Sequence, residues 1–374
     1  MKKIAILTWC YEVGPVNYGQ VLQCYALQRV IEKMGAEAKV LKFRRLTDEE
    51  SICDIQAVGN RFQYEKQYKN KQVEDQEKPD VKKFWDFIGR NIKLSNMCYT
   101  EEELKDEIRD VDAVVLGSDQ LWNPLWFDSV NLLGFAKEKR RLTYATGGID
   151  VRNKKSNQIY KQIADGIADF NRISVREKKS AQILEEYTKR EISTVLDPTL
   201  LLGTDDWDSI CINSGDNKKY IFCYCLGSVQ PHKHLIKAIA HKYGIEKVLY
   251  IKKDWFDQNF NEEGMFEAIC DAGPEDFVSY IKNAKCIITD SFHGCCFSII
   301  YGKIFYSLKR AYESSDMAAT SRMDNLFESL EMEKRWVSFK KDIEEMDIID
   351  YFKVQSKLEK LRHESILYLD GGIS

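Results

Sequence analysis

The chain alternates between short apolar runs and segments in which apolar residues recur at helical spacing. Residues 4–7 predict a buried first strand, Leu22 to Met34 carry one helical stripe that stops at Gly35, and residues 38–43 predict a second strand. This alternation is typical of βαβ units and of a mostly parallel sheet. By the same criterion, further strands are expected at residues 111–116, 141–145, 172–175, 194–198, 220–226, 247–251, 285–289 and 304–308.

A polar stretch at residues 199–219 separates two such series and predicts a domain boundary. We therefore expect an α/β protein with two Rossmann-like domains that face each other across a cleft. Residues 1–203 form the N-terminal Rossmann-like domain and residues 204–340 the C-terminal one. Residues 341–374 form a C-terminal helical segment, with a helix at about 341–366, that packs back on the N-terminal domain.

Residues 45–80 interrupt the first series with a polar stretch that has little apolar periodicity. Two interpretations stay open for it: a solvated helix or excursion, and a lid over a site.

The composition argues against a nucleic-acid-binding, a membrane-spanning and a secreted protein. The 374 residues carry a formal net charge of −4, which argues against a nucleic-acid partner, because binding to phosphates needs a basic surface. No apolar run is long enough to span a membrane, and the N-terminus does not read as a signal peptide, so a cytoplasmic protein is expected. The eleven cysteines are expected to be reduced, and no metal or other cofactor is predicted.

Candidate chemistry gathers where the predicted strands end, which is where open α/β sheets bind ligands. These positions hold small, polar and cationic residues that suit an anionic small molecule near helix N-termini. They are Asn17, Tyr18, Gly19, Ser118, Asp119, Asn123, Gly147 and Arg176 in the first series, and Gly227, Ser228, Ser291, His293, Gly294 and Arg322 in the second.

Several of these residues have a structural interpretation beside the functional one. Asn17 is a good helix cap, and the turn from Ser118 to Asn123 can be a capped turn that binds no substrate hydroxyl. Arg176 can bind a carboxylate or phosphate through two parallel hydrogen bonds, or pair with Glu177. Asp197, before Pro198, reads as a turn cap. Asp119, Asp197 and Asp290 are carboxylates at predicted strand ends, and a divalent cation bound to a phosphate there is the lesser alternative.

His293 is the strongest catalytic candidate. It follows a predicted strand by a few residues and directly precedes Gly294 at a predicted helix start. Imidazole titrates near neutral pH and can therefore give a proton to a substrate. A buried structural histidine is the competing interpretation.

Five segments in order resemble the polysaccharide pyruvyl transferase family. They are residues 17–28 (NYGQVLQCYALQ), 116–123 (LGSDQLWN), 173–177 (ISVRE), 195–202 (VLDPTLLL) and 289–294 (TDSFHG). The resemblance implies a GT-B-like fold and transfer of pyruvate from phosphoenolpyruvate to a sugar, as a ketal, in cell-surface polysaccharide synthesis. It further implies that Arg176 holds the donor and that His293 is the histidine of the family's most typical motif.

This chain has Ser291 where many members of the family have arginine. Arg322, or Lys309 and Arg310, is expected to supply the missing charge. The resemblance implies that the acceptor is a sugar, lipid-linked or nucleotide-linked, and leaves peripheral membrane association and oligomeric state open. Two alternatives remain: a nucleotide-sugar glycosyltransferase whose Gly227 loop holds a diphosphate, and a binding protein without catalysis.

Overall fold

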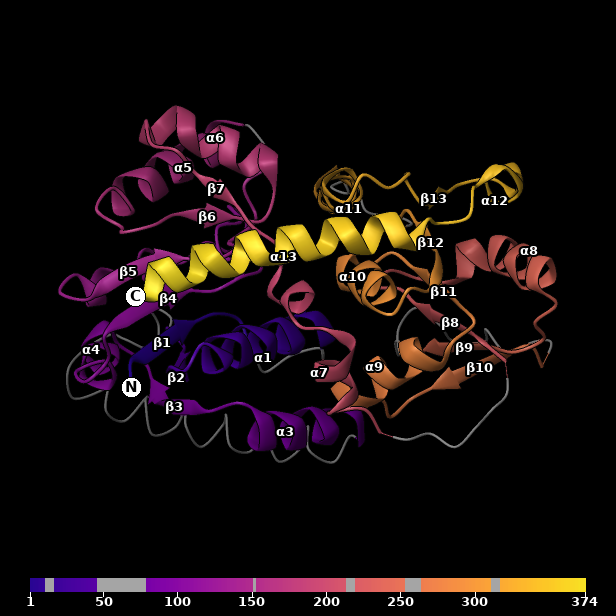
Figure 1. Cartoon of the computed structure of the whole chain (residues 1–374), viewed down its shortest axis with the longest axis horizontal. Helices are drawn as coiled ribbons and strands as arrows, with labels where there is room; N and C mark the ends of the chain where they lie inside the picture. Colours follow the sequence, from indigo (N-terminus) through magenta and orange to yellow (C-terminus); the bar gives the residue numbers. More distant parts are fainter. Residues whose placement is uncertain (11–16, 46–78, 151–152, 213–218, 253–263, 311–316) are drawn as a thin grey trace. The chain divides into compact units, whose positions relative to one another are not determined.

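The computed structural model describes residues 1–10, 17–45, 79–150, 153–212, 219–252, 264–310 and 317–374 (Figure 1). The polar stretch expected as an excursion or a lid at residues 45–80 lies almost entirely outside these ranges. Contacts within the chain define two compact units, Met1–Pro198 with Ser365–Ser374 (unit 1) and Thr199–Glu364 (unit 2). Each unit is built on a parallel sheet, which confirms the predicted pair of Rossmann-like α/β domains.

Unit 1 holds a five-stranded sheet in the order β3-β2-β1-β4-β5, and a small second sheet of β6 and β7. Every residue of β4 is buried, as its unbroken apolar sequence requires. The elements of the unit are β1 (Lys3–Leu7), α1 (Tyr18–Lys33), β2 (Glu37–Phe43), α3 (Pro79–Asn91), β3 (Leu94–Cys98), α4 (Glu101–Glu107), β4 (Ala113–Leu116), η1 (Ser129–Leu132), η2 (Gly134–Ala136), β5 (Arg140–Thr143), α5 (Lys154–Gly166), β6 (Ser174–Val175), α6 (Lys178–Thr188) and β7 (Ser193–Thr194).

The order of the strands places a switch point between β1 and β4 in unit 1. The chain moves from β1 outward to β2 and β3, then returns to pair β4 with the other side of β1. The crossovers therefore diverge at this pair of strands, and a crevice is expected outside their carboxyl ends.

Unit 2 holds a six-stranded parallel sheet in the order β10-β9-β8-β11-β12-β13, with the corresponding switch point between β8 and β11. Its elements are η3 (Pro198–Leu201), which begins at the last residue of unit 1, α7 (Thr204–Asp208), β8 (Ile221–Tyr224), η4 (Gln230–His232), α8 (Lys233–Tyr243), β9 (Val248–Ile251), β10 (Phe266–Ile269), α9 (Pro274–Asn283), β11 (Cys286–Thr289), α10 (Phe292–Ile300), β12 (Ile304–Leu308), α11 (Met317–Ser329), β13 (Trp336–Val337) and α12 (Lys340–Glu345).

The prediction of one helix at about 341–366 is wrong. The chain forms α12 and then a separate helix α13 (Tyr351–Ile373), because the backbone turns extended at Met346 and ends α12 there. Residues of α13 up to Glu364 belong to unit 2, and those from Ser365 belong to unit 1. Within unit 1, the Ser365 hydroxyl accepts a hydrogen bond from the Leu196 amide at 3.0 Å.

Among the described helices, none combines the length and the apolar sequence that crossing a bilayer requires. The cysteines in the described ranges are free thiols, and most of them are buried.

Candidate functional site

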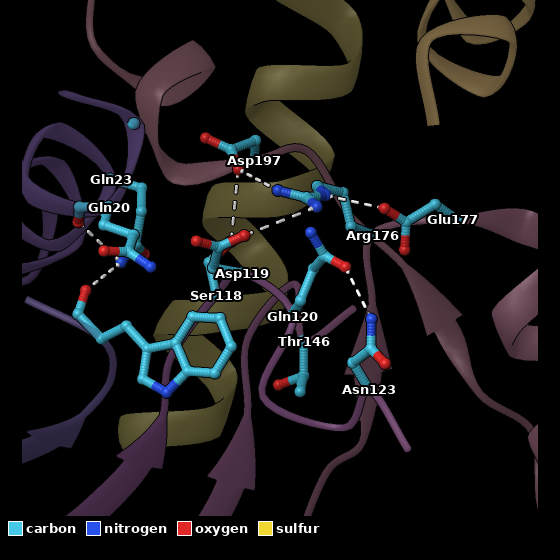
Figure 2. A network of polar contacts seen from close by, with 12 residues as sticks. Gln20, Gln23, Ser118, Asp119, Gln120, Asn123, Thr146, Arg176, Glu177 and Asp197 are labelled. Carbon is cyan, nitrogen blue, oxygen red and sulfur yellow. Dashed lines mark hydrogen bonds and ion pairs between the residues drawn. The ribbon is translucent and has the colours of Figure 1, made fainter. Parts of the chain in front are cut away.

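Arg176, directly after β6, is the centre of a buried ion-pair network in unit 1 (Figure 2). Its Nε lies 2.8 Å from Glu177 Oε1, and one terminal nitrogen lies 2.8 Å from Asp197 Oδ2. A carboxylate oxygen of Asp119 lies 4.0 Å from the other terminal nitrogen. Only 3% of Arg176 is exposed. The predicted ion pair with Glu177 is thus confirmed, and the guanidinium fork is engaged by carboxylates of its own unit.

The charge balance of this network is negative. One guanidinium against three carboxylates gives a formal charge of −2. Burial alone lowers the pKa of Arg176, but the carboxylates of Glu177, Asp197 and Asp119 outweigh burial and raise it above its ordinary value. Arg176 is therefore always charged, and the carboxylates around it oppose the approach of an anion.

The loop after β4 is tied to the same network. The Ser118 hydroxyl donates to Asp197 Oδ2 at 3.2 Å, and Asp119 adopts a φ of 74°. A left-handed backbone is uncommon for a residue other than glycine and costs free energy, so the surrounding contacts must hold it. The Gly147 amide does so in part by donating to the Asp119 carbonyl at 2.7 Å. The structure thus brings Ser118, Asp119, Gly147 and Arg176 together.

Asn123 closes the predicted turn. Its side-chain amide donates to Gln120 Oε1 at 2.9 Å (Figure 2). Its Oδ1 accepts from the Leu125 amide at 3.0 Å. The capped-turn interpretation is confirmed, and the binding of a substrate hydroxyl by Ser118, Asp119 or Asn123 stays a prediction.

Asn17 caps α1, as expected. Its Oδ1 accepts from the amides of Gly19 at 3.1 Å and Gln20 at 3.4 Å, which satisfies two of the first-turn donors. Tyr18 is buried, and its ring packs against Phe84 with centroids 4.9 Å apart. A ligand role for Asn17, Tyr18 or Gly19 stays a prediction.

In unit 2, three candidates meet at the start of α10. Ser291 caps this helix by accepting from the Gly294 amide at 3.4 Å, and His293 lies in its first turn with 7% of its surface exposed. A Cβ at Gly294 would lie 2.3 Å from Thr289 Oγ1, so only glycine lets the helix begin this close to the end of β11. The expected strand-end position of His293 is confirmed.

Asp290 organises the neighbouring strand ends of unit 2. Its two carboxylate oxygens accept from the amides of Leu226 at 2.5 Å and Gly227 at 2.8 Å, beyond the end of β8. Arg310, which follows β12, places its Nε 3.6 Å from Asp290 Oδ2. Asp290, Gly227 and Arg310 therefore share the edge at which α10 begins.

Arg322 belongs to α11, which packs on α10 through a 3.6 Å contact between the sulfurs of Cys295 and Met323. Arg322 is half-buried. Because Arg176 lies in unit 1 whereas His293 and Arg322 lie in unit 2, the expected convergence of the three around one molecule stays a prediction.

Sequence reasoning underrated Asp290 and Arg310. It named Asp290 only as a carboxylate that could bind a cation and Arg310 only as one of several substitutes for the missing arginine. Their position after adjacent parallel strands was the available signal, since such ends meet at one edge. Within the described ranges, no three His, Cys, Asp or Glu side chains are arranged to hold a metal ion.

Comparison with known proteins identifies relatives of the chain and of its fold. A family model described as polysaccharide pyruvyl transferase matches residues 17–311. Among curated proteins, none matches the chain in sequence. A UDP-glucosyltransferase from Polygonum tinctorium has a similar structure, with a TM-score of 0.53, 11% identity, and coverage of 100% of this chain and 98% of that one. The UDP-GlcNAc 2-epimerase from Neisseria meningitidis has a TM-score of 0.50 and 12% identity, with coverage of 98% of this chain and 94% of that one. Such structural neighbours have the GT-B fold, and at this identity they establish the fold of the chain alone.

Proposed function

Because the chain belongs to the polysaccharide pyruvyl transferase family, we propose that it transfers pyruvate from phosphoenolpyruvate to two hydroxyls of a sugar, forming a cyclic ketal. The observation that carries the proposal is the position of His293, in a family motif, in the first turn of α10 at the carboxyl end of β11. This is the edge of a parallel sheet where anionic ligands are bound by helix N-termini and strand-end loops.

His293 acts as the general acid in this mechanism. Its imidazolium gives a proton to the methylene carbon of phosphoenolpyruvate, which makes the adjacent carbon electrophilic. A sugar hydroxyl attacks that carbon and gives up its proton, which restores the imidazolium. A second hydroxyl of the same sugar then displaces inorganic phosphate, with loss of its proton to the phosphate, and closes the ketal ring.

Arg310 is the cation that we assign to the donor. Arg310 lies beside Asp290, and its side chain is 15% exposed. Asp290 directly precedes Ser291, the position at which many members of the family carry arginine. Because β11 and β12 are adjacent strands, Arg310 after β12 can supply near Ser291 the positive charge that the serine lacks. Arg322 on α11 is the second cation assigned to the donor in unit 2.

Arg176 has a positioning role in this proposal. Its guanidinium is already engaged by Glu177 and Asp197, and it lies among an excess of negative charge. It holds Asp197, and through Asp197 the Ser118 hydroxyl, in place. The donor contact that the family resemblance implies for Arg176 therefore has less support from the geometry than that of Arg310.

A donor screen by thermal shift tests the function. A ligand that binds only the folded protein at 100 times its Kd adds about 2.7 kcal/mol of stability, so phosphoenolpyruvate on its own should raise the melting temperature, whether or not UDP-N-acetylglucosamine also does. Incubation with phosphoenolpyruvate and a panel of lipid-linked and nucleotide-linked sugars should then release inorganic phosphate and yield a pyruvylated sugar by mass spectrometry.

The screen also separates the alternatives. Stabilisation by the nucleotide sugar alone, with transfer of its sugar, would replace this proposal with the glycosyltransferase. Binding of phosphoenolpyruvate without phosphate release from any acceptor in the panel would instead favour a binding protein.

A further inference from the structure

Unit 1 contains a cavity to which the proposed function assigns no ligand. Its volume is about 690 Å³, within the range of about 300–1,000 Å³ that small-molecule sites occupy. It is lined by the end of β1 and the residues that follow it, by parts of β2 and β3, and by the segment that follows β4. The cavity therefore reaches the carboxyl end of β1, which is one of the two strands at the switch point of this sheet.

Two tryptophans from the two sides of this switch point line the cavity. Trp9 follows β1 and Trp126 follows β4, and their rings lie 5.9 Å apart at an angle of 48°. The Trp126 side chain is 47% exposed, while its Nε1 donates to the Gln120 carbonyl at 3.2 Å. The Trp9 carbonyl accepts from Gln23 Nε2 at 2.9 Å. Hydrogen bonds therefore hold the Trp126 ring and the Trp9 backbone, and the two rings form adjacent walls of the cavity.

Two of the three charged residues that line the cavity form an ion pair with each other. Arg45 forms a two-pronged ion pair with Asp128, with Nε 3.0 Å and 3.1 Å from the two carboxylate oxygens and a terminal nitrogen 2.8 Å from one of them. Arg44 is the remaining charged residue of the lining. The lining thus combines aromatic and apolar walls with hydrogen-bonding side chains and one further cation, and such a lining suits a ring that carries several hydroxyls.

The angle of the tryptophan pair restricts the shape of the ligand. A flat nucleobase held between two rings requires these rings to be parallel, whereas Trp9 and Trp126 are tilted by 48°. A pyranose ring has an apolar face of C–H groups and a rim of hydroxyls, so it can cover an aromatic wall while its rim reaches polar side chains. In this cavity, Gln20 and the Arg45–Asp128 pair are polar side chains that such hydroxyls can reach.

We propose that this cavity binds a neutral hexopyranose ring, with its apolar face against Trp126 and Trp9 and its hydroxyls toward Gln20 and the Arg45–Asp128 pair. In identifying this ring as the one that receives pyruvate, the inference rests on the proposed function. The binding itself does not, and it can be measured without any donor.

Saturation-transfer NMR on the full chain tests the site. The probes are methyl β-D-glucopyranoside, methyl β-D-galactopyranoside and methyl α-D-mannopyranoside, with uridine as the flat-base alternative, each at up to about 50 mM so that millimolar Kd values are measured. At least one glycoside should bind saturably. Trp126→Ala should weaken it about tenfold or more, and Trp126→Tyr, which keeps an aromatic face, about threefold or less.

Leu125→Ala is the matched control, since Leu125 is the exposed neighbour of Trp126 in sequence and does not line the cavity. It should leave the affinity unchanged. Gln20→Ala, on the half-buried surface of α1, is the second variant and should weaken binding about threefold or more, so that the test survives if Trp126→Ala does not fold.

Three results would overturn the inference: no glycoside binds, Trp126→Ala and Gln20→Ala bind like the wild type, or uridine alone binds. A protein that binds a glycoside at Trp126 but does not release phosphate from phosphoenolpyruvate would keep this site and lose the proposed function. If the protein releases phosphate from phosphoenolpyruvate, but its acceptor affinity does not change when Trp126 or Gln20 is replaced, the proposed function is kept and this site is lost.

Discussion

At the carboxyl edge of each sheet, a glycine packs against a threonine that lies at the end of a strand. A Cβ on Gly117 of unit 1 would lie 2.6 Å from Thr8 Cβ, and a Cβ on Gly294 of unit 2 would lie 2.3 Å from Thr289 Oγ1. The two edges differ in what this close packing supports. In unit 1 it supports a buried arginine among three carboxylates, and in unit 2 it supports a histidine in the first turn of a helix.

This difference teaches that a charged residue after a strand is not by itself a ligand-binding residue. Arg176 has its charge matched within unit 1, so its removal would leave carboxylates without a counterion. His293 lies in a helix whose cap is supplied by Ser291, so the fold does not need the imidazole to close the helix end. We therefore expect the unit 1 network to be scaffold and the unit 2 edge to carry the chemistry of the proposed function, and the four predictions below test that contrast.

His293→Ala should have the largest effect on catalysis. Removing a general acid costs about 10²–10⁴ in rate, so turnover with phosphoenolpyruvate and an accepted sugar should fall by that factor while the melting temperature changes little. His241→Ala, at an exposed position of α8, is the control and should keep full turnover. Normal turnover of the His293 variant would remove it from the mechanism.

Arg176→Ala should have the largest effect on stability. Breaking a buried ion pair by removing one partner costs about 3–5 kcal/mol, because the other charges stay buried without compensation. Denaturant unfolding measures this loss. Arg109→Ala, which removes an exposed pair with Asp106, should cost no more than about 1 kcal/mol. An Arg176 variant that unfolds like the wild type but no longer binds phosphoenolpyruvate would show that Arg176 is a donor ligand after all.

Arg310→Ala should lower the affinity for phosphoenolpyruvate strongly and the stability of the fold only little, in contrast to Arg176→Ala. Hydrogen bonds to a charged group contribute about 1.5–3 kcal/mol, so the affinity for phosphoenolpyruvate should fall roughly tenfold to a hundredfold. The cost in stability should be smaller than for Arg176, because Asp290 keeps its bonds from the amides of Leu226 and Gly227. Calorimetric titration with phosphoenolpyruvate measures the affinity, and an unchanged Kd would exclude Arg310 as the donor cation.

Gly294→Ala should destabilise the protein less than Arg176→Ala does. The added methyl group must push Thr289 or α10 aside, and overpacking of this kind costs about 1–3 kcal/mol. Gly203→Ala, where nothing lies within 4 Å of the added Cβ, is the matched control in unit 2 and should change stability little. Since His293 shares the displaced turn, turnover should fall more than the loss of stability alone explains.

Much of the fold could be predicted because its central strands are short unbroken apolar runs. β4, β8 and β11 are buried along their whole length, and each leaves this pattern in the sequence. The edge strands β3 and β10 were missed, since their sequences, LSNMC and FEAI, mix polar and apolar residues. An edge strand has one open side and therefore needs less apolar surface.

The candidate site was predictable in part. The strand-end position of His293 and the cap at Asn17 could be predicted from local sequence, because a cap bonds to amides only two or three residues away. The cap at Ser291 is equally local but was not predicted. Asp119 and Asp197 reach Arg176 from two distant segments of the chain, and the cavity lined by Trp9 and Trp126 requires the order of the strands. Such long-range arrangements leave no pattern in any short stretch of sequence.

The division of α13 has a consequence for how the protein is made. Residues 365–374 belong to unit 1, where Tyr368 bonds the Thr143 carbonyl at 3.0 Å and Arg140 donates to the Gly372 carbonyl at 2.6 Å. A ribosome synthesises all of unit 2 before it reaches these residues. The first unit to begin folding is thus the last to be completed, and nascent chains arrested before Ser365 should expose the surface of β5 that this helix covers.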